Sequence, residues 1–169
     1  MSDPTHRVVF AHGKESGPWG SKIRALANVA KTQDYAVESP DYTATFDPKV
    51  RLAQLLQHAP QAQRLVLVGS SMGAYVSAMA CTKLQPCALF LMAPALYFDE
   101  YPDEPANCPA DTVVVHGWHD QVVPVARAWQ FAQPRNAELH LVNDGHRLNQ
   151  SIEFLCALFA RQLARVKAA

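Results

Sequence analysis

The chain has 169 residues, and its 15 basic and 15 acidic side chains give a formal net charge of zero. This length suits one domain with a core of its own, and the even, scattered charge argues against a nucleic-acid partner. No apolar run reaches the length of a membrane-spanning helix, so we expect no membrane partner either.

The first half of the chain alternates between apolar, β-branched runs and stretches with helical periodicity. The predicted elements are a strand at 7–11, a helix at 21–31, a short strand at 35–38, a helix at 48–58 and a strand at 64–68. Asp47 suits the N-cap of the second helix, because its carboxylate can accept a hydrogen bond from a first-turn amide. Pro48 suits the first helical position, where no amide donor is needed.

The second half continues the same alternation. The predicted elements are a helix at 74–84, strands at 88–92 and 112–116, a helix at 124–132, a strand at 138–142 and a final amphipathic helix at about 148–166. The segment 94–110 is rich in prolines, acids and aromatic residues and fits neither pattern. Irregular connections of this length are usually functional or mobile.

This order of elements predicts the fold class. Strands that alternate with helices need crossover connections, which produce a mostly parallel sheet with helices on both faces. We therefore expect an α/β fold, a three-layer α/β/α sandwich around a six-stranded sheet. The continuous apolar run at 65–68 fits a strand that is covered on both sides.

The cysteines and the N-terminus bear on the compartment. The four cysteines are widely spaced, without a Cys-x-x-Cys pair, and the first seven residues lack signal-peptide character. We expect free thiols and a cytoplasmic protein.

The pentapeptide Gly-Ser-Ser-Met-Gly at residues 69–73 is the most informative local pattern. It lies between a predicted strand and a predicted helix, and a Gly-x-Ser-x-Gly turn in that setting is typical of a nucleophile elbow. Such a turn is so tight that the central serine is strained, and a Cβ at either flanking glycine would collide with neighbouring backbone. The pattern predicts that Ser71 is a nucleophile.

Two further residues follow other predicted strands. Asp120 comes after the strand at 112–116, and His146 comes after the strand at 138–142. Because the carboxyl ends of parallel strands meet at one edge of the sheet, we expect Ser71, Asp120 and His146 to lie together.

Four motifs together resemble the α/β-hydrolase family, close to its small serine esterases without a cap domain. They are His-Gly at 12–13, the pentapeptide at 69–73, His-Gly-Trp-His-Asp-Gln-Val-Val-Pro at 116–124 and Asp-Gly-His at 144–146. The chain order Ser, Asp, His is also that of the family. The resemblance implies a minimal α/β-hydrolase fold in a single domain over 1–169, without a cap, in which the usual first two strands are absent.

Chemistry assigns a role to each residue of this set. A serine hydroxyl needs a base within hydrogen-bond reach, and His146 is the candidate. Asp120 would hold the other ring nitrogen and stabilise the imidazolium. Two backbone amides would bind the oxyanion: that of Met72 at the start of the following helix, and that of Lys14, to which the family pattern points.

Other interpretations remain open for several of these residues. Asp120 also suits the cap of the helix near residue 124, whereas Asp144 is too near His146 in sequence and is interpreted as a turn residue. His12 is interpreted as a scaffold histidine. His116 and His119 flank Asp120, but no further ligand has suitable spacing, so we predict no metal site.

Aromatic residues near the predicted strand ends are candidates for substrate binding. Trp118 and Tyr97 are chosen from a set that also includes Trp19, Phe98 and Tyr101, and for any one of these core packing is at least as good an interpretation. Tyr42 follows the second predicted strand and is placed at the border of the site.

The function expected from the sequence is a serine hydrolase of the carboxylesterase type, acting on small to medium acyl esters without a cofactor. A thioesterase, an amidase or peptidase with the same triad, and a catalytically silent hydrolase-like binding protein are the alternatives. The expected partner is a small acyl substrate, and the sequence leaves open whether the chain is a monomer or a homodimer.

Overall fold

The computed structural model describes residues 5–58 and 60–169. Residues 1–4, which belong to the stretch without signal-peptide character, lie outside the described residues. Within the described ranges, no helix combines the length and apolar character needed to cross a membrane.

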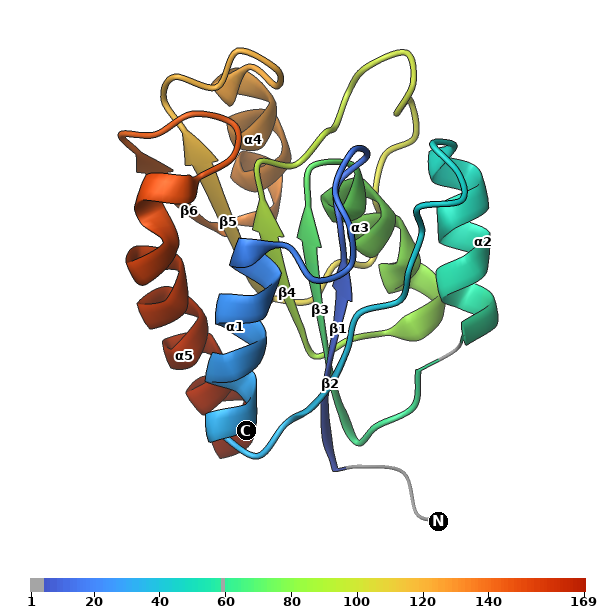
Figure 1. The fold of residues 1–169 in the computed structure, drawn as a ribbon, viewed down its shortest axis with the longest axis vertical. Helices are drawn as coiled ribbons and strands as arrows, with labels where there is room; N and C mark the ends of the chain where they lie inside the picture. The colour runs from blue at the N-terminus through green and yellow to red at the C-terminus, as the bar shows by residue number, and fades with distance from the viewer. Residues whose placement is uncertain (1–4, 59) are drawn as a thin grey trace.

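Across the described residues, six parallel strands form one sheet in the order β2-β1-β3-β4-β5-β6, which confirms the predicted fold class. The strands are β1 (His6–Ala11), β2 (Ala36–Glu38), β3 (Arg64–Ser70), β4 (Ala88–Met92), β5 (Asp111–Gly117) and β6 (Glu138–Val142). Their carboxyl ends lie at the upper edge in Figure 1. Every residue that directly follows a strand therefore starts at that edge.

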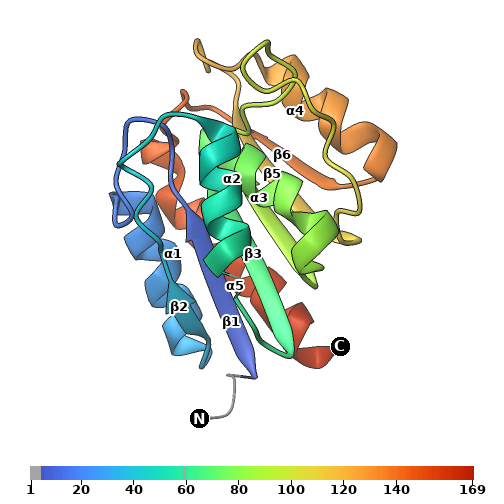
Figure 2. The ribbon, with the colours of Figure 1, turned by 90° about the vertical axis from the view of Figure 1, so that its right-hand side faces the viewer.

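Helices cover both faces of the sheet (Figure 1, Figure 2). One face carries α1 (Ser21–Thr32) and α5 (Ile152–Ala168), and the other carries α2 (Pro48–His58), α3 (Met72–Leu84) and α4 (Val125–Ala132). Alternate residues of β3 point to the two layers: Leu65 and Leu67 pack with α2, α3 and α4, while Val66 and Val68 pack with α1 and α5. This double burial explains why the strand is a continuous apolar run rather than an alternating one.

Most predicted boundaries lie within two residues of the observed ones, and two of the differences have a clear local cause. The strand predicted from Tyr35 begins at Ala36, because the Tyr35 amide donates to Ala30 O and closes the end of α1 (3.1 Å). The final helix begins at Ile152 rather than at Leu148, because Leu148 has a left-handed backbone (φ 53°) and a short 3₁₀ turn at Asn149–Ser151 follows it. Asp47 caps α2 as predicted, with the Lys49 amide donating to its Oδ1 (2.8 Å).

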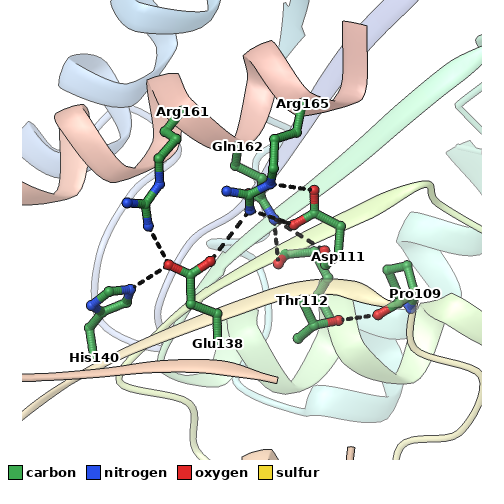
Figure 3. Close-up of polar contacts among 9 residues, drawn as sticks. Pro109, Asp111, Thr112, Glu138, His140, Arg161, Gln162 and Arg165 are labelled. Atoms are coloured by element: carbon green, nitrogen blue, oxygen red, sulfur yellow. Dashed lines mark hydrogen bonds and ion pairs between the residues drawn. The ribbon is translucent and has the colours of Figure 1, made fainter. Parts of the chain in front are cut away.

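A polar network ties α5 to the amino ends of β5 and β6 (Figure 3). Asp111 and Glu138 begin these strands, and Arg165 lies 2.8 Å from the first carboxylate and 3.5 Å from the second. Arg161 also pairs with Glu138. The buried Gln162 donates to the carbonyls of Leu89 (3.2 Å) and Asp111 (3.1 Å). The network fixes one edge of the sheet and leaves the carboxyl edge for loops.

Candidate active site

Ser71 stands in a strained turn between β3 and α3. Its backbone has a positive φ of 55° with ψ −116°, a conformation that residues with a side chain rarely adopt. The turn is tight because the backbones around it touch. A Cβ at Gly69 would lie 2.3 Å from Gly73 O, and a Cβ at Gly73 would lie 1.9 Å from Ala11 O. The backbone of Ser71 is therefore strained as predicted, and both flanking positions require glycine as predicted.

The structure brings Ser71, His146 and Asp120 into one hydrogen-bonded chain. His146 Nε2 lies 3.0 Å from Ser71 Oγ, and His146 Nδ1 lies 2.7 Å from Asp120 Oδ2. The three residues come from the carboxyl ends of β3, β6 and β5. With Nδ1–H donated to the carboxylate, Nε2 is free to accept the serine proton, which is the geometry of a nucleophile and its base.

Four donors surround the carboxylate of Asp120. Its Oδ1 accepts the amides of Val122 and Val123 (2.8 Å each), and its Oδ2 accepts His146 Nδ1–H and lies 3.2 Å from His116 Nε2. Burial alone would raise the pKa of Asp120, but hydrogen bonds from the two histidines and the two amides outweigh it and hold that pKa far below the ordinary value. Asp120 is therefore a fixed anion that orients the imidazole of His146. It also organises the turn before α4, but it does not cap that helix, because α4 begins at Val125 after Pro124 and no described side chain caps its first amides.

A second carboxylate shapes the loop that carries His146. Asp144 is buried, and its oxygens accept the Gly145 amide (2.7 Å), the Gln150 amide (2.9 Å) and the Ser151 hydroxyl (2.9 Å). These bonds hold the loop that follows β6 folded around the carboxylate of Asp144. Asp144 thus behaves as the turn residue that its position in the sequence suggested.

The loop after β1 lies against the nucleophile. A Cβ at Gly13 would come within 3.7 Å of Ser71 Cβ and 3.6 Å of Ser70 O. His12 is buried, with Nδ1 2.9 Å from Gly13 O and Nε2 accepting the Tyr42 amide at 3.0 Å. The ring thus carries its proton on Nδ1 and serves as a scaffold.

The two residues expected to offer oxyanion donors belong to two segments near Ser71. Met72 is the first residue of α3, so its amide belongs to the positive end of that helix. Lys14 follows Gly13 in the loop after β1 and lines the same cavity as Ser71. The Lys14 ammonium turns outward to Glu100 at 3.7 Å.

A cavity of about 680 Å³ opens beside Ser71 and His146. Its apolar side is built by the segment 94–110 and the loop after β5, and its polar side by the loop after β1 and the start of α1. The apolar wall consists of Ala95, Phe98, Tyr101, Val122 and Val123. The irregular segment therefore forms part of the pocket, and α3 holds it in place through a bond from Thr82 Oγ1 to Ala106 O (3.1 Å).

The three aromatic residues expected to bind substrate do not line this cavity. Tyr42 is buried under the loop after β1, against the ring of His12. Tyr97 turns away to Glu104, to which its hydroxyl donates at 3.1 Å. Trp118 is 56% exposed on the surface. Each follows a strand end in sequence, but the local path of the loop carries its side chain elsewhere.

Among the described residues, no group of three or more His, Cys, Asp or Glu side chains is arranged to hold a metal ion. His119, which lies near Asp120 in sequence, bonds instead to Asn143 Oδ1 (2.7 Å).

The sequence interpretation gave no role to Arg51, which contacts the loop after β1. Arg51 is on α2 and is fully buried. Only its place one turn before Leu55, on the buried face of an amphipathic helix, could have singled it out.

Comparison with known proteins places this geometry in context. The family model described as "Uncharacterised protein family (UPF0227)" matches residues 7–104. A structure from Xanthomonas campestris pv. campestris, assigned to the alpha/beta hydrolase superfamily, is 36% identical with a TM-score of 0.87, over 95% of this chain and 99% of that one. No curated protein matches the chain.

Two more distant structures share the fold. Est1E from Butyrivibrio proteoclasticus is 16% identical with a TM-score of 0.82, over 99% of this chain and 90% of its own, and Est1E has also been solved with ferulic acid bound. XC6422 from Xanthomonas campestris, an α/β serine hydrolase without a lid, is 20% identical with a TM-score of 0.74, over 98% of this chain and 84% of its own.

Proposed function

Because the chain belongs to the UPF0227 family and to the α/β hydrolases, we propose that it is a serine carboxylesterase that forms an acyl-enzyme on Ser71. The observation that carries the proposal is the continuous chain from Asp120 through His146 to Ser71 Oγ, which opens into a cavity with one apolar wall. A buried anion, an oriented imidazole and a strained serine are the parts that acyl transfer requires.

In the proposed acylation step, Ser71 Oγ attacks the ester carbonyl while its proton passes to His146 Nε2. The imidazolium that forms is stabilised by Asp120. The carbonyl oxygen becomes an oxyanion, and the amides of Met72 and Lys14 are the proposed donors to it. His146 then returns the proton to the leaving alcohol, and the acyl group remains on Ser71.

Deacylation repeats the same proton path with water. His146 takes a proton from the water as it attacks the acyl carbonyl, and it returns that proton to Ser71 Oγ as the acid leaves. The apolar wall around Phe98 and Val122 suits a small or medium acyl group. The ferulic acid bound to Est1E gives limited support, since a carboxylic acid is the product that ester hydrolysis releases.

The test is Ser71→Ala, assayed on nitrophenyl esters of increasing acyl length. Loss of the nucleophile should lower kcat/KM by about four powers of ten or more. Ser77→Ala is the matched control, because Ser77 is a buried serine of α3 whose hydroxyl has no hydrogen-bond partner among the described residues. Its activity should stay at the wild-type level.

A fluorophosphonate probe provides an independent readout. It should label wild type at Ser71, as located by mass spectrometry of the tryptic peptides, and should leave Ser71→Ala unlabelled. Activity of Ser71→Ala within a few-fold of wild type, or labelling at another residue, would contradict the proposal. A wild type that neither hydrolyses esters nor reacts with the probe would instead indicate a silent binding protein.

A further inference from the structure

Arg51 is a buried cation that forms no ion pair with a carboxylate in the described part of the chain. Taking a guanidinium out of water is costly unless its donors find partners. Its position on α2 does not place it at the sheet edge by sequence. The groups that accept hydrogen bonds from the buried guanidinium therefore identify the part of the chain that Arg51 holds in place.

Those groups are backbone carbonyls. Nη1 donates to His12 O (3.2 Å) and Gly13 O (3.0 Å), and Nη2 donates to Lys14 O (3.0 Å). Nε donates to Thr45 O at 2.9 Å. Three of the four acceptors are successive residues of the loop that lies against Ser71. A planar guanidinium presents donors on three nitrogens in one rigid fork, whereas a lysine ammonium presents its three donors on a single rotatable nitrogen.

These bonds set the direction of the Lys14 amide. The peptide unit between Gly13 and Lys14 is trans and planar, so its C=O and N–H point in opposite directions. Because the Gly13 carbonyl faces Arg51, the Lys14 N–H points away from Arg51. Gly13 itself lies next to Ser71, as the 3.7 Å approach of a Cβ there shows. A peptide flip would turn the amide toward α2 and present a carbonyl instead.

We infer that Arg51 is a positioning residue, whose hydrogen bonds to the loop 12–14 hold the Lys14 amide in the direction needed to bind the oxyanion. The inference rests on the proposed esterase function. His12 supports the same peptide, because its Nδ1–H also donates to Gly13 O (2.9 Å). The Lys14 carbonyl has Arg51 as its donor, so removal of the guanidinium loosens the loop on the side of that amide.

The experiment compares Arg51→Met, Arg51→Lys and the control Leu55→Ala. Leu55 is buried on the same helix but belongs to the apolar core, so its truncation destabilises the fold without touching the loop. The fraction of working sites is measured by burst titration, and kcat is expressed per titrated site. A boronic acid that forms a tetrahedral adduct on Ser71 measures oxyanion binding separately from substrate binding.

Arg51→Met should lower kcat per titrated site by about 100-fold, the loss typical of one missing oxyanion donor, while KM changes by less than about threefold. Affinity for the boronic acid should fall by a similar factor. Arg51→Lys keeps the positive charge but not the planar guanidinium, and its kcat per titrated site should fall by about tenfold. Added guanidinium ion should partly restore the kcat of Arg51→Met. Leu55→Ala should lower the unfolding midpoint and keep kcat per titrated site.

A purely structural role for Arg51 would give a different result. In that case Arg51→Met would unfold more readily but keep wild-type kcat per titrated site and wild-type boronic acid affinity, which would overturn the inference. If Arg51→Met does not fold, Arg51→Lys decides, and a wild-type kcat in that variant is the contradicting outcome. A wild type without Ser71-dependent hydrolysis would overturn the esterase proposal and this inference with it. An active wild type whose kcat per titrated site does not change on substitution of Arg51 would overturn the inference alone.

Discussion

At the residue scale, one carboxylate oxygen is approached by two histidines. Asp120 Oδ2 lies 2.7 Å from His146 Nδ1 and 3.2 Å from His116 Nε2. His116 Nε2 is also 2.8 Å from Val123 O, so it carries a proton, because a carbonyl can only accept. In the part of the chain that the structure describes, the buried Nδ1 of His116 has no hydrogen-bond partner. His116 therefore acts as a donor that holds Asp120, while His146 lies between Asp120 and Ser71 and is hydrogen-bonded to both.

The lowered pKa of Asp120 predicts how its contribution to stability depends on pH. The carboxyl ionises more readily in the folded chain than in the unfolded one, so its contribution is present above the unfolded pKa of about 4 and is lost as pH falls toward the folded value. Asp120→Asn resembles the protonated acid. The free energy of unfolding of wild type should exceed that of the variant by a constant amount above about pH 5, and the difference should shrink below about pH 4.

Urea denaturation of both proteins from pH 3 to pH 7 measures this difference. Asp144→Asn serves as the comparison, because Asp144 is also buried and multiply hydrogen-bonded, but within the described residues the partners of its carboxylate are Gly145, Gln150 and Ser151 rather than a histidine ring. An Asp120 difference that stays constant down to pH 3 would contradict the stabilising role of the two histidines.

The residues of the hydrogen-bonded chain could be predicted from the sequence because each lies within four residues of the end of a strand. The Gly-x-Ser-x-Gly turn and the chain order identify Ser71, Asp120 and His146, and the rule that parallel strands end at one edge brings them together. Arg51 was not predicted because its partners in the loop 12–14 are 37 to 39 positions away in the chain and are carbonyls, which have no sequence signature. Tyr97 was misplaced for a related reason: a positive φ of 63° turns its backbone, and composition does not reveal such a turn.

At the element scale, the contact between β1 and α3 determines where the nucleophile stands. Gly73 lies so close to the end of β1 that an added Cβ would be 1.9 Å from Ala11 O and 2.7 Å from His12 O. Both neighbours are backbone atoms, which cannot rotate away as a side chain would. Helix α3 can therefore approach the sheet closely only with glycine at this position.

Gly73→Ala should move α3 away from β1 and displace Ser71 from His146. We expect a loss of about 3 kcal/mol in the free energy of unfolding and a fall of about 100-fold in kcat/KM, since a displacement of about 1 Å has this effect on catalysis. Gly17→Ala is the matched control: an added Cβ meets nothing within 4 Å, so stability should stay equal or rise by about 0.5 kcal/mol. Chemical denaturation measures both variants, and equal stabilities would refute the argument.

Elements with regular periodicity were predicted to within a few residues, and irregular ones were not. The bounds of α2, β4 and β6 agree with the structure because turn residues, prolines or caps mark their ends. The start of α5 was placed four residues early, since Leu148 continues the apolar spacing but adopts a left-handed backbone. The segment 94–110 was expected to matter from its length, but which of its aromatic residues face the cavity depends on its path.

At the scale of the whole molecule, the carboxyl edge and the amino edge of the sheet have different roles. The carboxyl edge carries Ser71, Asp120 and His146 together with the loops that form the cavity. The amino edge of β4 and β5 is closed by α5 through Gln162, and Arg165 adds ion pairs to Asp111 and Glu138 (Figure 3). A sheet about five residues long separates the proposed chemistry from this network, since β4 spans 5 residues.

This separation predicts that stability and activity can be changed independently. Gln162→Ala removes a fully buried amide that donates to Leu89 O, Asp111 O and Asp111 Oδ1, so it should cost about 2 kcal/mol in the free energy of unfolding. Arg165→Ala removes ion pairs from a side chain that is 40% exposed, and solvent screening should keep its cost below about 1 kcal/mol. Neither variant should change kcat of the folded enzyme, because neither side chain reaches the carboxyl edge.

Urea denaturation and ester hydrolysis of the same preparations measure both quantities. A larger loss of stability in Arg165→Ala than in Gln162→Ala would show that exposed charge, rather than buried hydrogen bonding, holds α5 to the sheet, and a fall in kcat would show that the two edges are coupled.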